Sequence, residues 1–281
     1  MYNFTRVTTD NEANAAHAGL LANVFEKPVL FTPAFIKWQY ADNPAGQIVG
    51  YNAMAGDVMA AHYVTQPFYA VLEGRKSKGL LSLNTATHAD HRGKGLFTRL
   101  ADKTYEAAAA EGYEFVIGVA NQNSVHGFTK KLGFQLAGQL HAKVGFGHPP
   151  AINSNVNAQY ERIWDAQMLN WRLANPSNNY LSAGGKMVSF YSKTHIPFIK
   201  SHLVSIDKSI VNKEFGSTVF NPLTLYIGID AGIKFTGSTF FNIPLRFRPA
   251  PLYLIFKDLT GKGQVLDFDN IRFRLIDFDA Y

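Results

Sequence analysis

One stretch of the sequence decides the fold: Thr87-His88-Ala89-Asp90-His91-Arg92-Gly93-Lys94-Gly95-Leu96-Phe97. It joins an apolar run, residues 80–87, that predicts a strand to residues 95–111, which are rich in strong helix formers. The first N–H groups of a helix have no backbone partner, and the helix dipole adds partial positive charge there. The two glycines let an anion approach the backbone without a Cβ in the way, while Arg92 and Lys94 add charge at the rim. The stretch therefore predicts a site for a pyrophosphate.

Two familiar phosphate-binding motifs are excluded at this turn. No Gly-Lys-Ser/Thr follows at P-loop spacing, and the third glycine and distant acidic residue of a dinucleotide fingerprint are missing. Between Val71 and Lys103 there are seven basic residues against Glu73, Asp90 and Asp102, which suits a phosphate-bearing ligand. A solvated loop and helix face would explain this charge equally well.

The flanking sequence predicts alternating helices and strands through residue 146. Helices are expected at 10–25, 33–40, 95–111 and 124–132, and strands at 48–55, 58–68, 80–87, 115–120 and 134–146. Gly56-Asp57 predicts a tight hairpin between the first two strands. The fold class is thus α/β (α+β), with a mixed, mostly antiparallel sheet flanked by helices and one strand–helix–strand crossover.

The clearest linker is His148-Pro149-Pro150, which divides the chain into residues 1–148 and 149–281. The second part is expected to hold a helix at 159–172 and to be β-rich thereafter, with strands at 252–256 and 271–278. A short motif, Trp38-Gln39-Tyr40-Ala41-Asp42-Asn43-Pro44, recurs as Trp171-Arg172-Leu173-Ala174-Asn175-Pro176. Either this is chance, or the second domain is a degenerate repeat of the first.

Two blocks in the first part carry a family resemblance. Arg92-Gly93-Lys94-Gly95-Leu96-Phe97 resembles the Arg-x-x-Gly-x-Gly/Ala signature of the GNAT acyltransferase superfamily. Asn121-Gln122-Asn123-Ser124, leading to Lys131-Leu132-Gly133-Phe134, resembles the second half of that signature. The order of elements over residues 1–146 is similar as well, and the second domain would then be a GNAT-like repeat that lacks the signature.

The resemblance implies acetyl-CoA as co-substrate and assigns residues to it. The backbone of Thr85, Ala86 and Thr87 would hold the pantetheine arm and polarise the thioester carbonyl. The pyrophosphate would lie on the turn formed by Arg92, Gly93, Lys94, Gly95 and Leu96. Asn123 or Ser124 would bind further along the CoA.

Two positions depart from the family pattern. Phe97 stands where a small residue is usual, as in a subgroup of larger GNAT proteins with an added C-terminal domain. The tyrosine that protonates the leaving thiolate would fall near Phe128 or Thr129, and neither can act as that acid. A thiol is a good leaving group at neutral pH, so the reaction tolerates this loss.

The general base is open among several residues. Histidine suits the task by its pKa, and His88 and His126 are candidates together with Glu73. His91 beside the turn is a further alternative. Each of them is equally well explained as a turn or surface residue. No metal site is expected, because no His-x-x-x-His pair with an acidic partner occurs.

The resemblance implies direct attack of a primary amine on acetyl-CoA. Trp38, Tyr40 and Asn43 are candidates for the wall of the acceptor site, although Trp38 and Tyr40 could equally be core residues. The acceptor is expected to be a small amine, with an amino sugar favoured. The alternatives are transfer of a longer acyl group and a non-catalytic CoA-binding or protein-interaction module.

Composition narrows the remaining classes. The 281 residues are 47% hydrophobic and 17% charged with a net charge of +6, as in an ordinary globular protein. Cysteine is absent, which excludes disulfides and thiolate chemistry. No apolar run reaches the roughly 18 residues of a membrane span, and no signal peptide is recognisable. We expect a cytoplasmic protein with a small-molecule partner and no nucleic-acid partner, while the sequence leaves the oligomeric state open.

Overall fold

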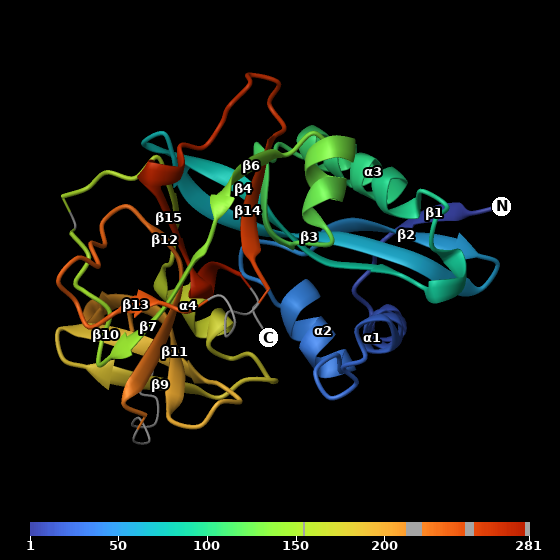
Figure 1. The fold of residues 1–281 in the computed structure, drawn as a ribbon. Coiled ribbons are helices and arrows are strands. Elements are labelled where there is room, and N and C mark those ends of the chain that lie inside the picture. The colour runs from blue at the N-terminus through green and yellow to red at the C-terminus, as the bar shows by residue number, and fades with distance from the viewer. Residues whose placement is uncertain (154, 212–220, 245–249, 279–281) are drawn as a thin grey trace.

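A mixed sheet runs through the whole protein, with helices on both of its faces (Figure 1). The computed structural model describes residues 1–153, 155–211, 221–244 and 250–278. Within these ranges, fifteen strands join in the order β6-β14-β5-β4-β3-β8-β15-β12-β11-β10-β9, and β1, β2, β7 and β13 attach beside this path. Most neighbouring strands are antiparallel, so the predicted fold class is confirmed.

The first half follows the predicted order of elements closely. Its strands are β1 (Asn3–Arg6), β2 (Val49–Ala55), β3 (Val58–Leu72), β4 (Arg75–Thr87), β5 (Phe115–Asn121), β6 (Gln135–Gln139) and β7 (His141–Phe146). Its α-helices are α1 (Asn11–Phe25), α2 (Pro33–Tyr40) and α3 (Leu96–Ala110). The helix expected at 124–132 contains a π-helical turn at Gly127–Lys131, and the strand expected at 134–146 is divided between β6 and β7.

The second half is β-rich, as expected. Its strands are β8 (Tyr160–Arg162), β9 (Tyr180–Gly184), β10 (Met187–Lys193), β11 (Ile199–Asp207), β12 (Leu223–Asp230), β13 (Phe241–Asn242), β14 (Leu252–Asp258) and β15 (Ile271–Arg274). Its α-helix is α4 (Ala166–Arg172). The helix predicted over 159–172 is wrong over residues 159–165, because Tyr160–Arg162 pairs with β3 and β15 as a strand and α4 begins at Ala166.

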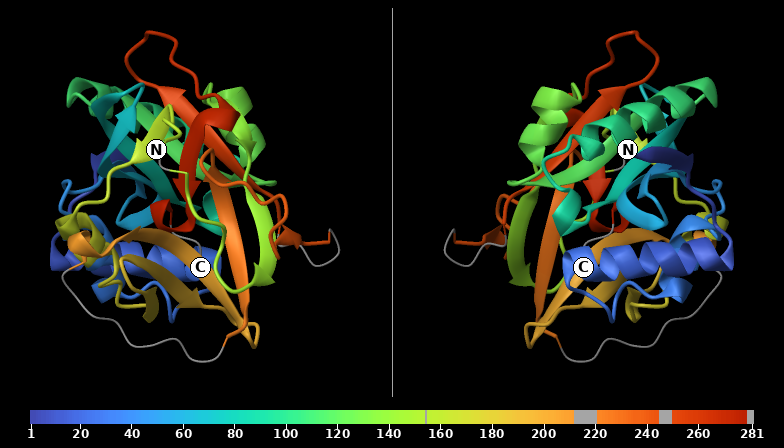
Figure 2. Two further views of the ribbon diagram at one scale, coloured as in Figure 1. Left: turned by 90° about the vertical axis from the view of Figure 1, so that its left-hand side faces the viewer. Right: turned by 90° about the vertical axis from the view of Figure 1, so that its right-hand side faces the viewer.

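The helices divide the interior of the first half into two cores. Helices α1 and α2 lie on one face of the sheet and α3 lies on the other (Figure 2). The α1/α2 core includes Leu21, Phe35 and Leu254 and continues into the second half. The α3 core includes Leu100, Val116 and Ile255. Because Leu254 and Ile255 alternate between the two cores, strand β14 is buried on both faces.

The two halves exchange strands. After β6 the chain crosses over, and β7 pairs with β12 from Gly228↔His141 to Leu223↔Phe146. In return, β14 lies between β5 and β6 and pairs with both. The boundary predicted at residue 148 therefore divides the sequence, whereas the sheet is shared by both parts.

The two copies of the repeated tryptophan motif contact each other at the junction of the halves. The indole rings of Trp38 on α2 and Trp171 on α4 stack at 5.1 Å and 16°. Trp38 Nε1 donates to the carbonyl of Trp171 at 2.8 Å, and Trp171 Nε1 donates to the carbonyl of Trp38 at 2.9 Å. The two copies of the motif thus make one reciprocal contact.

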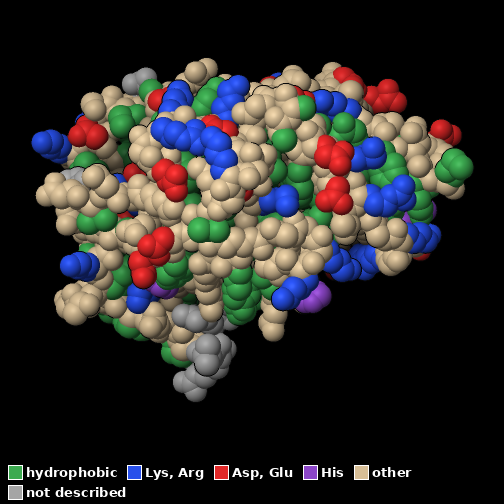
Figure 3. Space-filling model, turned by 90° about the horizontal axis from the view of Figure 1, so that it is seen from above, with side chains coloured by type: hydrophobic (Ala, Val, Ile, Leu, Met, Phe, Trp, Pro, Cys, Tyr) green, Lys and Arg blue, Asp and Glu red, His purple; other side chains and the backbone are tan. Residues whose placement is uncertain are grey.

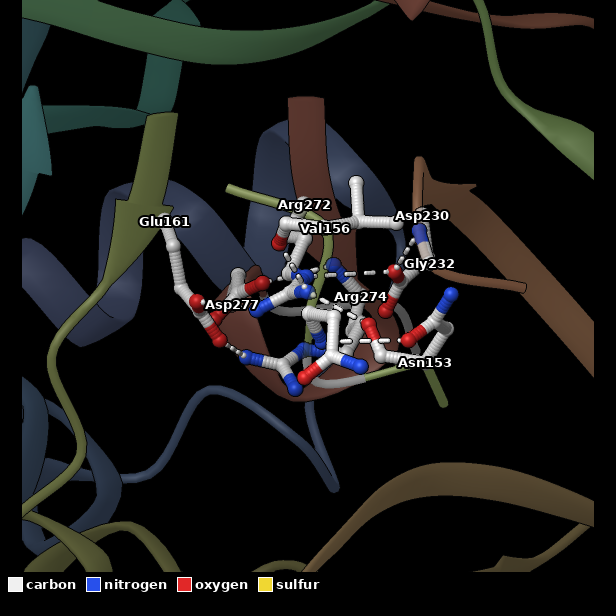
Figure 4. Close-up of polar contacts among 9 residues, drawn as sticks. Asn153, Val156, Glu161, Asp230, Gly232, Arg272, Arg274 and Asp277 are labelled. Carbon is white, nitrogen blue, oxygen red and sulfur yellow. Dashed lines mark hydrogen bonds and ion pairs between the residues drawn. The ribbon is translucent and has the colours of Figure 1, made fainter. Parts of the chain in front are cut away.

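A charged cluster joins β8, β12 and β15 in the second half (Figure 4). The Arg272 and Arg274 guanidinium groups donate to opposite oxygens of Glu161 at 2.9 and 2.8 Å. Arg272 also faces Asp230 at 3.4 Å, and the Arg274 backbone N–H donates to Asp277 at 2.6 Å. Both arginine side chains are about nine-tenths buried, so Glu161 is needed to balance their charge.

We predict that Glu161→Gln lowers the free energy of unfolding by about 3 kcal/mol, because the two buried guanidinium groups lose the carboxylate they share. Urea denaturation at pH 7.5 measures this loss. The matched control is Glu111→Gln, which breaks an exposed ion pair with Arg6 and should cost less than about 1 kcal/mol. Equal losses in the two variants would contradict a special role for the cluster.

Candidate functional site

The central feature of the candidate site is a wedge between β4 and β5. These parallel strands pair only from Gly79↔Phe115 to Ser82↔Gly118. Beyond that point β4 continues beside β3, while β5 continues beside β14. Residues 83–87 of β4 and 119–121 of β5 therefore face each other without a shared ladder. An extended ligand placed between them could use their free backbone groups.

A β-bulge makes the strands diverge. The β3–β4 register shifts between His62 and Val64, and Asn84 of β4 has a φ of +47°. Its side chain donates to Gln39 Oε1 at 2.6 Å and to the Tyr40 hydroxyl at 3.0 Å, both on α2. These two bonds hold a backbone conformation that non-glycine residues rarely adopt.

We call these two hydrogen bonds of Asn84 the clamp. A chain of buried polar side chains continues from it toward α1. The Tyr40 hydroxyl is 2.8 Å from His62 Nε2, and His62 Nδ1 is 2.6 Å from Asn52 Oδ1. Asn52 Nδ2 lies 3.1 Å from His17 Nε2. Because Asn52 Oδ1 can only accept, His62 carries its proton on Nδ1 and Tyr40 donates to Nε2. The clamp on Asn84 is thus part of a rigid network.

The predicted phosphate turn follows Thr87, at the open end of the wedge, which we call its mouth. Gly93 and Gly95 have φ of +75° and +68°, and a Cβ added to either would meet no heavy atom within 4 Å. Gly95 precedes α3 and provides no side chain to cap its first N–H groups. A cavity of about 320 Å³ opens here, lined by Thr87, His91, Arg92, Gly93, Lys94, Gly95, Leu96, Phe97, Thr98 and Lys131. Open space, free N–H groups and nearby cations are what an anion requires.

Positive charge surrounds this turn. Arg99 and Lys103 project from α3 over the ring of Phe4, and Lys94 lies 5.9 Å from the ring of Tyr2. Figure 3 shows Lys and Arg side chains over both halves of this face, including the half that carries α3. Lys131 was not among the predicted residues, although the Lys-Lys pair before Leu132-Gly133 could have suggested it.

The residues predicted to bind the cofactor lie on the two arms of the wedge and at its mouth. Thr85, Ala86 and Thr87 form the end of β4 that lies beside β3 but does not pair with β5, and Arg92 to Leu96 form the turn. Asn123 and Ser124 follow the end of β5, where their N–H groups donate to Asn121 Oδ1 at 2.9 and 3.0 Å.

The three candidate bases are not brought together. His88 follows β4 directly, and its Nδ1 accepts from the Asp90 N–H at 3.4 Å. His126 is exposed at the start of the π-helical turn. Glu73 precedes β4, and seven strand steps, about 23 Å, separate Arg75 at the start of β4 from Ser82, where the wedge begins. This separation removes Glu73 from the candidate bases for chemistry in the wedge.

The structure corrects the predicted acceptor wall. Trp38, Tyr40 and Asn43 are 6%, 0% and 5% exposed and belong to the interior. Trp38 stacks on Trp171, Tyr40 supports Asn84, and Asn43 Nδ2 donates to the carbonyl of Pro67 at 2.8 Å. Burial leaves none of the three free to contact an acceptor directly.

A chain of hydroxyl groups reaches the closed end of the wedge, where the β4–β5 pairing stops, from the α3 face of the sheet. The Tyr105 and Tyr63 hydroxyls are 2.6 Å apart, and the Tyr63 hydroxyl is 2.9 Å from Ser82 Oγ. Burial raises the pKa of Tyr63 to about 12, which keeps this hydroxyl protonated. Ser82 is half-buried and is the last residue of β4 that pairs with β5. Sequence reasoning missed this chain because its members come from β3, β4 and α3.

The position at which the GNAT resemblance expects an acid tyrosine, near Phe128 and Thr129, is apolar. The ring of Phe128 is 6% exposed and packs 5.1 Å from Phe97 and 5.2 Å from Phe134. Thr129 Oγ1 donates to the carbonyl of Val125 at 2.9 Å. Neither residue presents a proton donor to the wedge.

Comparisons with known proteins bear on this site. Residues 5–137 match the family model of an acetyltransferase (GNAT) domain. Among curated proteins, no sequence matches the chain. In the described residues, neither a helix suited to crossing a membrane nor a group of three acidic or histidine side chains suited to a metal is found.

Several solved structures share the fold over most of the chain. A probable N-acyltransferase from Enterococcus faecalis has a TM-score of 0.63 at 11% identity, covering 92% of this chain and 73% of that one. A GCN5-related N-acetyltransferase from Anabaena variabilis has a TM-score of 0.61 at 10% identity, with the same coverage. N-myristoyltransferase from Saccharomyces cerevisiae, with bound myristoyl-CoA, has a TM-score of 0.60 at 7% identity, covering 91% and 82%. At these identities the likeness shows the fold alone.

We predict that stability falls as the pH drops below 6.5. Burial lowers the pKa of His17 to about 4 and the pKa of His62 well below its usual value. The unfolded chain takes up these protons near pH 6.5 while the folded chain does not. The free energy of unfolding should thus decrease toward pH 4 by about 1.4 kcal/mol per pH unit for each ring.

Urea denaturation between pH 7.5 and 5 measures this slope. His17→Gln keeps an acceptor for Asn52 and should remove one ring's share of the slope. A free energy of unfolding that stays constant over this range would contradict the prediction.

Proposed function

Because residues 5–137 belong to the GNAT acetyltransferase family, the protein is an acyltransferase, and we propose that it transfers an acetyl group from acetyl-CoA to a primary amine of a small acceptor. The observation that carries the proposal is the alignment of the open glycine turn with the wedge between β4 and β5. A ligand with an anionic head and an extended arm fits both features at once.

Each part of the co-substrate has a counterpart in the site. The N–H groups of Gly93 to Leu96 bind the pyrophosphate, with Arg92 and Lys131 beside it. The pantetheine arm lies along the free edge of residues 85–87 like an added strand. Backbone N–H groups at the bulge then point at the thioester oxygen and stabilise the charge that develops on it.

The reaction is direct attack of a neutral amine on the thioester. The C–N bond forms, the C–S bond breaks, and CoA leaves as a thiolate. The proton lost by the amine goes to water or to a base near the wedge, for which His88 and His126 stay candidates.

The Ser82 hydroxyl takes over part of the missing tyrosine's task. The proposal assigns Tyr105 as donor to Tyr63 and Tyr63 as donor to Ser82, which leaves the Ser82 proton free to point into the wedge. It donates a hydrogen bond to the leaving sulfur and lowers the energy of the developing thiolate without transferring the proton.

The second half is a degenerate GNAT-like repeat in this proposal. The reciprocal contact of Trp38 and Trp171 supports it, as do the matching turns in which Asn43 and Asn175 accept from the N–H two residues on. This half has no Arg-x-x-Gly-x-Gly signature, so it shapes the acceptor site rather than binding a second CoA.

Two alternative functions are considered, together with the cellular location. Transfer of a longer acyl group has the fold likeness to a myristoyl-CoA-binding enzyme in its favour. A non-catalytic CoA-binding or protein-interaction module has the apolar Phe128 in its favour. The ordinary globular composition is the support for the proposed cytoplasmic location.

We predict that wild-type protein binds acetyl-CoA with micromolar affinity and that Gly93→Ala and Gly95→Ala weaken binding at least 30-fold. A methyl group at either position fills the open cradle and strains a positive φ. Isothermal titration calorimetry measures the affinity, and titration with myristoyl-CoA and with CoA lacking its 3′-phosphate tests the acyl and phosphate subsites.

The matched control is Gly112→Ala, at the end of α3. Gly112 has a φ of +79° and no atom within 4 Å of an added Cβ, so the strain is similar but the cradle is untouched. Its affinity should equal that of wild type. Binding that survives in the Gly93 and Gly95 variants, or tighter binding of myristoyl-CoA, would overturn the proposed site or the proposed acyl group. Absence of thiol release with every amine tested would favour the non-catalytic alternative.

We predict that Ser82→Ala lowers kcat about 10-fold with little change in KM for acetyl-CoA, because the hydrogen bond forms only as the thiolate develops. Thiol release followed with a chromogenic disulfide measures both constants. The matched control is Ser77→Ala, a buried serine of the same strand whose hydroxyl has no partner among the described residues. A drop of the same size in both variants would assign the effect to strand β4 as a whole.

A further inference from the structure

A long groove lies where the chain crosses from the first half into the second. It consists of two adjoining cavities of about 630 and 520 Å³ that share His141, Lys143, Asn242 and Phe268. We name it the crossover groove after the β6–β7 crossover that forms one wall. The other wall comes from the end of β12, from β13 and from the short helix at Phe268–Asn270.

We propose that the crossover groove is the acceptor site and that its ligand is an oligosaccharide or sugar conjugate carrying a primary amine. This proposal rests on the proposed function, since it places the acceptor relative to the acyl-CoA wedge.

The groove begins close to the wedge. Asn121, at the exposed end of the free arm of β5, pairs with Leu252 of β14, and the Leu252 carbonyl accepts from the N–H of Leu140, which lines the groove. Leu252 is half-buried whereas Leu254 is fully buried, so the route between wedge and groove runs over the Leu252 end of β14 and spans two strand spacings, about 10 Å. An acceptor bound in the groove must be elongated for its amine to reach the thioester.

The groove also opens on the appropriate face. Residues paired directly across strands point to the same side of a sheet, and Leu254, which pairs with Gly138 of β6, belongs to the α1/α2 core. The ring of Phe268 covers Gly138 on this side, since a Cβ there would fall 1.9 Å from Phe268 Cδ2. The phosphate turn leads into α3, on the opposite side. Co-substrate and acceptor thus approach the wedge from different faces without competing for space.

The lining combines aromatic rings with hydrogen-bonding groups. Phe235 and Phe240 lie 5.8 Å apart, and Phe268 lies 5.7 Å from the ring of His141. Lys143 Nζ donates to Asn242 Oδ1 at 2.9 Å and lies 5.0 Å from the ring of Phe235, while Asp269 is exposed at the rim. The C–H faces of a sugar ring pack on aromatic rings, and its hydroxyls bond amide, ammonium and carboxylate groups. An aryl amine would use the rings and leave the polar groups unmatched, and a polyamine would do the reverse.

The test uses the β-1,4-linked dimer of glucosamine as acceptor, with phenethylamine and spermidine for comparison, and follows thiol release from acetyl-CoA. We expect the dimer to have the highest kcat/KM. Phe241→Ala removes a ring that is 54% exposed at the groove, so the fold should tolerate it. The variant should raise KM for the dimer at least 10-fold and leave KM for acetyl-CoA unchanged.

Phe146→Ala is the matched control, because Phe146 is 60% exposed on β7 and does not line the groove. It should leave both KM values unchanged. A second measurement, calorimetric titration of the N-acetylated dimer, reports product binding without any turnover and should weaken in the Phe241 variant alone.

The outcomes separate the two proposals. If acetyl-CoA binds but the dimer neither reacts nor binds, or if phenethylamine or spermidine is the better substrate, the saccharide assignment is overturned and the proposed function stands. Equal effects of Phe241→Ala and Phe146→Ala would overturn the groove as the binding site. If acetyl-CoA itself does not bind, the proposed function fails and this inference fails with it.

Discussion

The clamp on Asn84 is the interaction on which the candidate site depends. A regular parallel pair would hold β4 and β5 together along their whole length, and no extended ligand could enter between them. The bulge ends the pairing at Ser82 and Gly118, and the bonds from Asn84 to Gln39 and Tyr40 hold its positive φ. Because Tyr40 is bonded in turn to His62, the clamp is anchored to β3 as well as to α2.

The strand exchange explains why the wedge survives in a sheet so large. The arm of β5 that leaves β4 is supported on its other edge by β14, which comes from the second half of the chain. Strand β14 contributes side chains to both cores and lies between β5 and β6. The second half thereby completes the first half structurally, and the crossover of β7 that balances this exchange also forms a wall of the groove.

Local features of the fold could be predicted from the sequence, and non-local partners could not. The turn at Gly93 and Gly95 and helix α3 follow from glycine and helix-former patterns within about twenty residues. The sequence predicts helix at residues 160–162 because Tyr160, Ile163 and Trp164 have the spacing of one helix face. Only the pairing of Tyr160–Arg162 with β3 and β15 makes the segment a strand. The run at 252–256 indicated a strand, but nothing local shows that it inserts between β5 and β6.

The site residues divide in the same way. The predicted cofactor residues lie around one turn and the strand ends beside it because contiguous motifs carry them. The sequence predicts Trp38 and Tyr40 in an acceptor wall, whereas their burial follows from contacts with Trp171 and Asn84, which lie far away in the sequence. The hydroxyl chain and the crossover groove were missed because each is assembled from three or more separate segments, none of which has a distinctive pattern of its own.

The two departures from the family signature have one physical origin. The ring of Phe97 lies 5.1 Å from Phe128 and 6.1 Å from Tyr63, and a Cβ on Gly127 would fall 3.2 Å from Phe97 Cε1. A phenylalanine at position 97 therefore fills the space between α3 and the π-helical turn and favours an apolar partner at position 128. A tyrosine there would place its hydroxyl among aromatic rings, where an unpaired polar group is costly. The nearest hydroxyls that can be paired are those of Tyr63 and Tyr105, across the same aromatic cluster, and they are connected to the wedge through Ser82. In the proposed mechanism, packing at Phe97 moves the polar group from the helix to the strand side of the wedge, where the leaving sulfur would meet a hydrogen-bond donor instead of an acid.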